Sequence, residues 1–120
     1  SLANYCSVSS GTRIWCKSND YSQDLVILHH TEGINLKDDP IGGDVSIGEM
    51  CGVGANSVIM PSNIIPEGVV IGALSFVPSE FEFEPWSVYA GSPIRLVKRR
   101  NKNRVLRQRA ILEDWLENKA

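Results

Sequence analysis

The sequence predicts an all-β fold, a parallel β-helix of triangular section, followed by one C-terminal α-helix. Its main signature is a spacing of six between aliphatic residues, unlike the 3.6 of a helix or the 2 of an exposed strand. Glycine or another small residue often follows the aliphatic one. Coils that turn a corner every six residues bury their apolar side only when neighbouring coils stack on them. The residues at this spacing are Leu2, Val8, Ile14, Ile41, Ile47, Val53, Ile59, Ile65, Ile71 and Val77.

The successive segments follow from where this spacing holds and where it breaks. Residues 2–17 predict about one coil, and residues 45–78 predict nearly two coils in uninterrupted register. Residues 18–43 are polar and off the spacing, so they predict a long loop that leaves the solenoid, as lids and binding loops do. We therefore expect a β-helix over residues 1–100 with an insertion at about 18–43, and a separate helical segment over 101–120.

The C-terminal third of the sequence contains two further elements. In residues 79–93, Glu80, Glu82 and Glu84 alternate with Phe81 and Phe83, and Trp86 follows. These aromatic residues either line a binding mouth or, as we favour, cap the open end of the solenoid. Residues 103–118 predict a helix with an apolar stripe. Basic residues precede this helix and acidic residues end it, which opposes the helix dipole, so tertiary contacts should hold it in place. The stripe consists of Val105, Leu112, Trp115 and Leu116.

Composition narrows the possible classes of function. The chain has 120 residues and a formal charge of −2, which gives no electrostatic reason to expect nucleic acid or a membrane surface as partner. It contains no apolar run of about 18 residues that would predict a membrane span, and no signal-peptide pattern. Cys6, Cys16 and Cys51 lack metal-ligand spacing, and their odd number fits buried thiols in a reducing cytoplasm. We expect a cytoplasmic protein that needs no metal. The first aliphatic residue is already in register, which leaves open whether further coils precede it.

Two groups of motifs carry a resemblance to a known family. Residues 47–61 and 71–77 resemble the repeats of the hexapeptide-repeat acyltransferases. Residues 85–98, with Ala90-Gly91-Ser92-Pro93 at their centre, are similar to the segment that closes the solenoid in sugar O-acetyltransferases. The resemblance implies a left-handed β-helix, a homotrimer with active sites between subunits, and acetyl-CoA as the acyl donor.

The resemblance implies a catalytic base on the long loop. Many sugar acetyltransferases carry a His-Asp-Tyr-Ser stretch, and this chain has Asn19 in place of the histidine, followed by Asp20. An asparagine side chain forms hydrogen bonds but cannot act as a base near neutral pH. His29 and His30 are the only imidazoles in the chain, so either of them is a candidate base, with a slight preference for His30. The alternative is that both are loop histidines without a role.

The resemblance also places the CoA site. The small residues at coil corners that approach the pantetheine arm correspond to Ala55 and Ala73, and the next corner corresponds to Pro78 and Ser79. Arg95 and Lys98 match two basic positions near the nucleotide phosphates, where a planar guanidinium and a point charge both suit phosphate. Both alanines are equally consistent with ordinary turn residues.

Three functions remain open at this point. The first is an acetyl-CoA-dependent O-acetyltransferase acting on a hydroxyl of a sugar or polysaccharide precursor, by direct attack on the thioester. The second is an N-acyltransferase acting on an amino sugar. The third is a catalytically silent hexapeptide-repeat scaffold or binding protein, which the asparagine at position 19 favours and the retained closing segment opposes.

Overall fold

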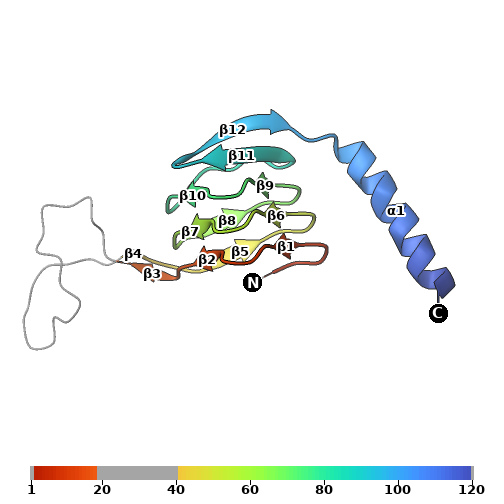
Figure 1. The fold of residues 1–120 in the computed structure, drawn as a ribbon, viewed down its shortest axis with the longest axis horizontal. Helices are drawn as coiled ribbons and strands as arrows, with labels where there is room; N and C mark the ends of the chain where they lie inside the picture. Colours follow the sequence, from red (N-terminus) through yellow and green to blue (C-terminus); the bar gives the residue numbers. More distant parts are fainter. Residues whose placement is uncertain (1, 19–40, 120) are drawn as a thin grey trace, which may run out of the picture.

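A computed structural model describes residues 2–18 and 41–119, so most of the predicted loop lies outside the described residues. Twelve short strands precede a single long helix in the described part of the chain (Figure 1). The elements are β1 (Ser7–Val8), β2 (Arg13–Ile14), β3 (Lys17–Ser18), β4 (Ile41–Gly42), β5 (Val45–Ile47), β6 (Gly52–Val53), β7 (Val58–Ile59), β8 (Asn63–Ile65), β9 (Val70–Ile71), β10 (Phe76–Val77), β11 (Ser87–Gly91), β12 (Ile94–Arg99) and α1 (Lys102–Lys119).

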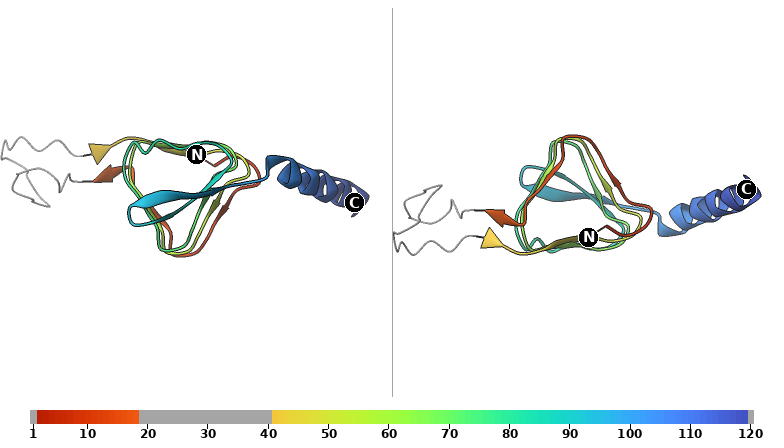
Figure 2. Two further views of the ribbon diagram at one scale, coloured as in Figure 1. Left: turned by 90° about the horizontal axis from the view of Figure 1, so that it is seen from above. Right: turned by 90° about the horizontal axis from the view of Figure 1, so that it is seen from below.

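Apart from the antiparallel pairs β11–β12 and β3–β4, the strands pair in parallel, so that each coil lies on the one before it. One sheet has the order β1-β6-β9-β11-β12, a second has the order β10-β7-β2, and a third pairs β5 with β8. Seen along the stack, the coils superpose in a triangular outline (Figure 2). In the parallel pairs, partner residues are 18 positions apart, as in Val53↔Ile71, except across the insertion, where Val8 pairs with Val53, 45 positions away. The prediction of parallel β-structure with one C-terminal helix is confirmed.

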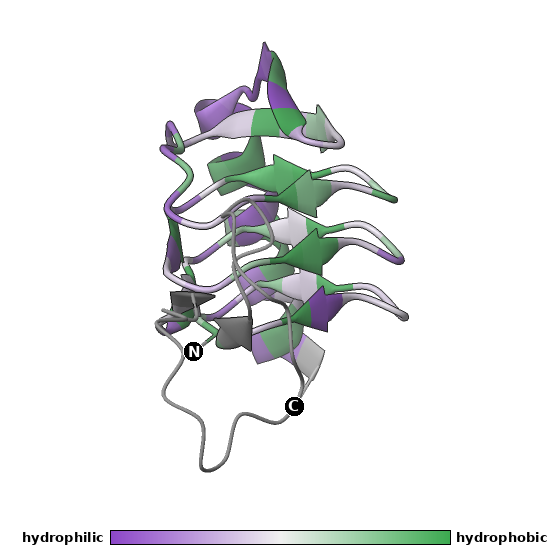
Figure 3. Ribbon diagram, turned by 90° about the vertical axis from the view of Figure 1, so that its left-hand side faces the viewer, coloured by the Kyte–Doolittle hydropathy of each residue, from purple (hydrophilic) through white to green (hydrophobic). Residues whose placement is uncertain are grey.

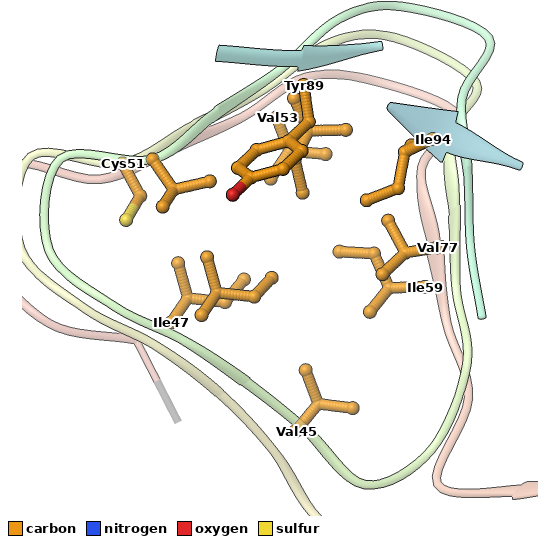
Figure 4. Close-up of a cluster of buried hydrophobic side chains, with 11 residues drawn as sticks. Val45, Ile47, Cys51, Val53, Ile59, Val77, Tyr89 and Ile94 are labelled. Atoms are coloured by element: carbon orange, nitrogen blue, oxygen red, sulfur yellow. The ribbon is translucent and has the colours of Figure 1, made fainter. Parts of the chain in front are cut away.

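Each hexad points two side chains into the stack: the aliphatic residue of the six-residue spacing and one more. Ile59, Ile65 and Ile71 are at most 1% exposed, and Figure 4 shows the labelled core side chains directed toward the centre of the coils. The residue two positions earlier is also buried in each hexad. Hydrophobic strands consequently lie one above another in successive coils (Figure 3). This second inward set contains Val45, Cys51, Ser57, Asn63, Val69 and Ser75.

The polar side chains of this second set form hydrogen bonds with the neighbouring coil. The Ser57 hydroxyl donates to the Gly72 carbonyl at 3.0 Å, and the Asn63 side-chain amide donates to the Pro78 carbonyl at 2.9 Å. The Asn63 side-chain oxygen in turn accepts a hydrogen bond from the Phe81 amide. A buried polar group without such partners would cost free energy, so these bonds favour one register between coils.

Every corner of the triangle contains a residue with positive φ in each coil. These residues stack in successive coils and so mark three corners. Most of them are not glycine, so stacking of the coils imposes a positive φ that these residue types seldom adopt alone. Gly68 is required where it stands, because a Cβ there would lie 2.3 Å from the Trp86 ring. The first corner contains Tyr5, Met50, Gly68 and Trp86; the second contains Gly11, Asn56 and Leu74; the third contains Gly43, Ser62 and Glu80.

Two sequence expectations about buried residues are wrong for the first coil. Leu2 is 62% exposed and Ile14 is 40% exposed, although both are in register, with Ile47 and Ile59 respectively. They lie at the end of the stack and have a neighbouring coil on one side only.

Among the thiols, Cys51 is buried as expected, Cys6 is half-buried, and Cys16 is exposed.

The aromatic residues divide between two roles. Phe81 and Phe83 pack edge-to-face on Tyr89, with centroids 5.5 and 5.2 Å away, and this cluster covers the top of the core as the capping interpretation predicts. Trp86 does not cap the column. It lies buried at the first corner, with the cationic groups of Arg100 and Lys102 within 5.6 Å of its ring centroid.

Helix α1 is held at the first corner by polar contacts. Arg100, just before the helix, donates to the carbonyls of Met50 and Gly68, both at 2.8 Å. Farther along, Arg109 lies over the Tyr5 ring, and Glu113 accepts hydrogen bonds from both of these side chains. The expectation that tertiary contacts hold this helix is confirmed. Its predicted apolar stripe remains largely exposed, at 41% for Leu112, 54% for Trp115 and 48% for Leu116.

We expect the docking of α1 to weaken in acid. Hydrogen bonds from Arg109 and then Tyr5 hold the pKa of Glu113 below its usual 4.5. A carboxylate with a lowered pKa contributes stability that is complete above about 4.5 and is lost as the pH falls through the lowered value. Amide exchange in α1, corrected for its intrinsic rate, should therefore accelerate below pH 4.5. Glu113→Gln should show fast exchange already at neutral pH, whereas Glu117→Gln should behave like the unmodified chain.

Candidate functional site

The outer face of the five-stranded sheet is lined by small residues. Val53, Ile71 and Tyr89 point inward, so their neighbours on either side point outward. A shallow hollow of about 310 Å³ follows this face, and we call it the trough. Glycine is needed at position 54, because a Cβ there would lie 2.3 Å from the Ala73 amide nitrogen of the next coil. The outward residues of the trough are Ser7, Ser9, Gly52, Gly54, Val70 and Gly72.

Arg95 and Lys98 lie on the same face, at the end of the sheet formed by β12. They share this face because the hairpin of β11 and β12, here called the closing hairpin, has an irregular register. Residues three apart on a regular strand point to opposite sides, which would separate Arg95 from Lys98. The pairing of β11 with β12 shifts register between Val88 and Tyr89, so Lys98 pairs with Val88 and Arg95 pairs with Ala90. Positions 88 and 90 both point outward, so both cations share the outer face with the trough.

Ala55 and Ala73 lie at the second corner, along one edge of the trough. They are stacked in successive coils, and the Leu74 amide donates to the Ala55 carbonyl at 2.9 Å. The structure thus places these two predicted site residues beside each other, on the side of the sheet where Arg95 lies. Ala55 and Ala73 thus offer small side chains along this edge of the trough, and Leu74, which is 72% exposed, lies at the same corner.

Pro78 and Ser79 are not part of this cluster. They follow β10 and approach the third corner, one side of the triangle away from Ala55 and Ala73. The Pro78 carbonyl is occupied by the Asn63 amide, and the Ser79 hydroxyl is buried without a hydrogen-bond partner in the described part of the chain. The four predicted donor residues at coil corners therefore fall on two separate corners of the chain.

The predicted catalytic residues Asn19, Asp20, His29 and His30 lie outside the described residues. The strands that flank them are described: β3 and β4 pair antiparallel, and the Gly43 amide donates to the Cys16 carbonyl at 3.0 Å. These strands leave the body at the third corner, whereas the sheet that carries the trough lies between the first and second corners (Figure 2).

The buried thiol is poorly suited to covalent catalysis. Desolvation raises the pKa of Cys51 above its usual 9.0, and the group donates to the Pro66 carbonyl at 3.0 Å. A thiolate is the reactive form of cysteine, so burial disfavours it here.

Comparison with known proteins identifies relatives in one broad class of enzyme. No protein-family model matches the chain. A Lysinibacillus sphaericus protein described as "Probable macrolide acetyltransferase" is 37% identical over 76 residues, which are 63% of this chain and 41% of that protein. An Escherichia coli dTDP-4-amino-4,6-dideoxy-D-glucose acyltransferase is 29% identical over 103 residues, 84% of this chain and 50% of that protein. The chain thus spans about half the length of these relatives.

The solved structures agree in fold and class. AntD, an N-acyltransferase from Bacillus cereus crystallised with dTDP and coenzyme A, matches with a TM-score of 0.77 and 27% identity. The match covers 94% of this chain and 59% of AntD. These findings confirm the resemblance to acyltransferases that the sequence predicts. In residues 2–18 and 41–119, no helix has the length and apolar character needed to cross a bilayer.

Proposed function

We propose that this chain carries the donor-binding part of an acyltransferase that moves an acyl group from coenzyme A to a sugar. The main support for this proposal is the outer face of the five-stranded sheet, where the trough leads to Arg95 and Lys98. The similarity to acyltransferases over most of the chain supports this assignment.

The trough and the second corner suit the two halves of coenzyme A. The pantetheine arm is long and uncharged, and a floor of glycine and alanine lets it approach the backbone closely. The phosphates carry the charge of the donor, and the paired cations at the top of the sheet would neutralise it by charge-assisted hydrogen bonds. We place the arm along Ala55 and Ala73 and the phosphates near Arg95 and Lys98.

The acceptor is a sugar, and either a hydroxyl or an amine can be the group acylated. The resemblance of the closing segment favours a hydroxyl. The similarity to AntD and to the dTDP-amino-sugar acyltransferase supports an amine at least as well. Transfer to matched pairs of sugars that differ only in hydroxyl or amine at one carbon would separate the two reactions.

We propose that the complete site forms between copies in a homotrimer. In one chain, the strands that lead into the predicted catalytic loop leave at the third corner, away from the trough. A cyclic assembly would bring the third corner of one copy beside the trough of the next and create three identical clefts. Sedimentation that shows only monomer at micromolar concentration would contradict this assembly.

The left hand of the solenoid and the domain division at residue 100 likewise stay predictions.

The proposed chemistry needs a base on the loop. The acceptor hydroxyl or amine attacks the thioester carbon, loses a proton to the base, and displaces the CoA thiolate. His29 or His30 is the proposed base, with Asp20 as an alternative; Asn19 can only orient groups by hydrogen bonds.

The activity itself is tested by release of free thiol. Incubation of the chain with acetyl-CoA and a panel of sugars and nucleotide-linked amino sugars should liberate CoA only in the presence of an acceptor. If no acceptor in the panel causes thiol release while CoA still binds, the chain is a binding protein or scaffold, and the proposed reaction is wrong.

We expect Arg95→Ala to weaken CoA binding by roughly 1.5–3 kcal/mol, the range for hydrogen bonds to charged groups. Isothermal titration calorimetry measures this directly. Arg13→Ala is a matched control, because Arg13 is an exposed cation on β2, in a different sheet. Equal affinity of the Arg95 variant and the unmodified chain, with the fold intact, would move the phosphate site elsewhere.

A further inference from the structure

A second basic hollow adjoins the proposed donor site. It is a groove of about 490 Å³ between the end of β12 and the first turns of α1, a size within the range of small-molecule sites. Among the residues that the structure describes, no carboxylate lines it. We call it the helix groove, and its lining includes Val88, Lys98, Arg99, Arg100, Arg104 and Gln108.

The cations that line the helix groove differ in whether they already have a partner and so in whether they are free to bind an anion. Arg99 pairs with Glu84, and Arg100 donates to two backbone carbonyls at the first corner. Lys98 and Arg104 have no carboxylate partner among the described residues. Within residues 2–18 and 41–119, these two positive charges therefore have no paired counter-charge.

The start of α1 adds to this positive field. The first turn contains no acidic residue, and the exposed amide groups of a helix N-terminus carry a partial positive charge. Asn101 caps the helix by accepting from the Arg104 amide at 3.0 Å, which places Arg104 within the first turn. A bound anion would relieve the unfavourable order of charges along this helix.

The helix groove is continuous with the outer face of the sheet. Val88 and Lys98 pair across the closing hairpin and point outward above the trough, and the same two residues line the groove. A ligand with its arm along Ala55 and Ala73, at the edge of the trough, and its first phosphates near Lys98 would therefore reach the groove with its remaining end. Val88 and Val105 offer apolar contact there, and Gln108 offers an amide.

From this continuity we propose that the helix groove binds the 3′-phosphoadenosine end of coenzyme A, with Arg104 as the residue that recognises the 3′-phosphate. This inference rests on the proposed function. Arg104 projects from α1, outside the segments that carry the family resemblance. The same phosphate chemistry could come from a nucleotide-linked sugar acceptor, so the test includes a nucleoside diphosphate.

The experiment compares CoA with 3′-dephospho-CoA, two ligands that differ only in the phosphate in question. Calorimetric titration of the unmodified chain should give roughly 5- to 20-fold tighter binding for CoA, in line with a charge-assisted hydrogen bond at an exposed site. Arg104→Ala should lose this preference by weakening CoA binding alone. Arg107→Ala is the matched control, because Arg107 is an exposed cation of the same helix that lines a different hollow with Asn103 and Ala110. It should keep the preference.

The other outcomes each overturn a distinct claim. If the Arg104 variant still prefers CoA to its dephosphorylated form, the 3′-phosphate lies elsewhere, while the proposed function stands. If the variant weakens binding of dTDP but not of CoA, the groove belongs to the acceptor and the assignment to coenzyme A is wrong. If the unmodified chain binds neither CoA nor dephospho-CoA, the proposed function itself fails. Circular dichroism on each variant establishes that the helix is retained.

Discussion

The Ile59→Asp variant is expected to lose most or all of its folding stability. Ile59 has no exposed surface, and it stands in register between Ile14 in the coil below and Val77 in the coil above. An aspartate there would have to bury a charge among aliphatic side chains or take up a proton. Burial of an unpaired charge is among the few single changes that exceed about 4–5 kcal/mol, against a total stability of about 5–15 kcal/mol for a typical domain.

Urea unfolding followed by circular dichroism measures this effect. The matched control is Ile64→Asp, the same substitution on β8 at a side chain that is 77% exposed. A substitution away from buried features usually changes stability by about 0.5 kcal/mol or less. If both variants unfold at the same urea concentration as the unmodified chain, the inward column does not hold the coils together.

The double variant His29→Ala/His30→Ala should lower turnover by about 100- to 10,000-fold, the usual contribution of a positioned base. The acceptor must lose a proton as it attacks, and an imidazole titrates near neutral pH. CoA affinity should barely change, because the proposed phosphate contacts are at Arg95 and Lys98. Steady-state thiol release gives turnover, and calorimetry gives the affinity.

Asn19→Ala serves as the comparison for the loop. It should lower turnover far less than the histidine double variant, because an amide can orient a group but cannot accept its proton. Full activity of the double variant would exclude both imidazoles as the base. The proton would then pass to Asp20, to another segment of the protein, or, for an amine acceptor, to solvent from the amine itself.

The sequence alone predicted the elements whose pattern is local. The six-residue spacing identified the inward column from Ile47 to Val77, because the chain turns a corner every six residues and each side of the triangle repeats the same inward position. The helix was predicted at 103–118 and lies at Lys102–Lys119, since an apolar stripe and the absence of breakers are properties of a single segment. The second inward position in each hexad was missed, although the buried Cys51, two before Val53, already signalled it.

The tertiary structure decided how these elements share corners and faces. A register shift in the closing hairpin, invisible in a spacing of three, brings Arg95 and Lys98 to one face. Stacking separates Pro78 and Ser79 from Ala55 and Ala73, and the docking of α1 creates the helix groove. Leu2 and Ile14 keep the register but not the burial. Periodicity therefore determined which side chains point inward, whereas stacking, hairpin pairing and helix docking determined which residues distant in sequence became neighbours.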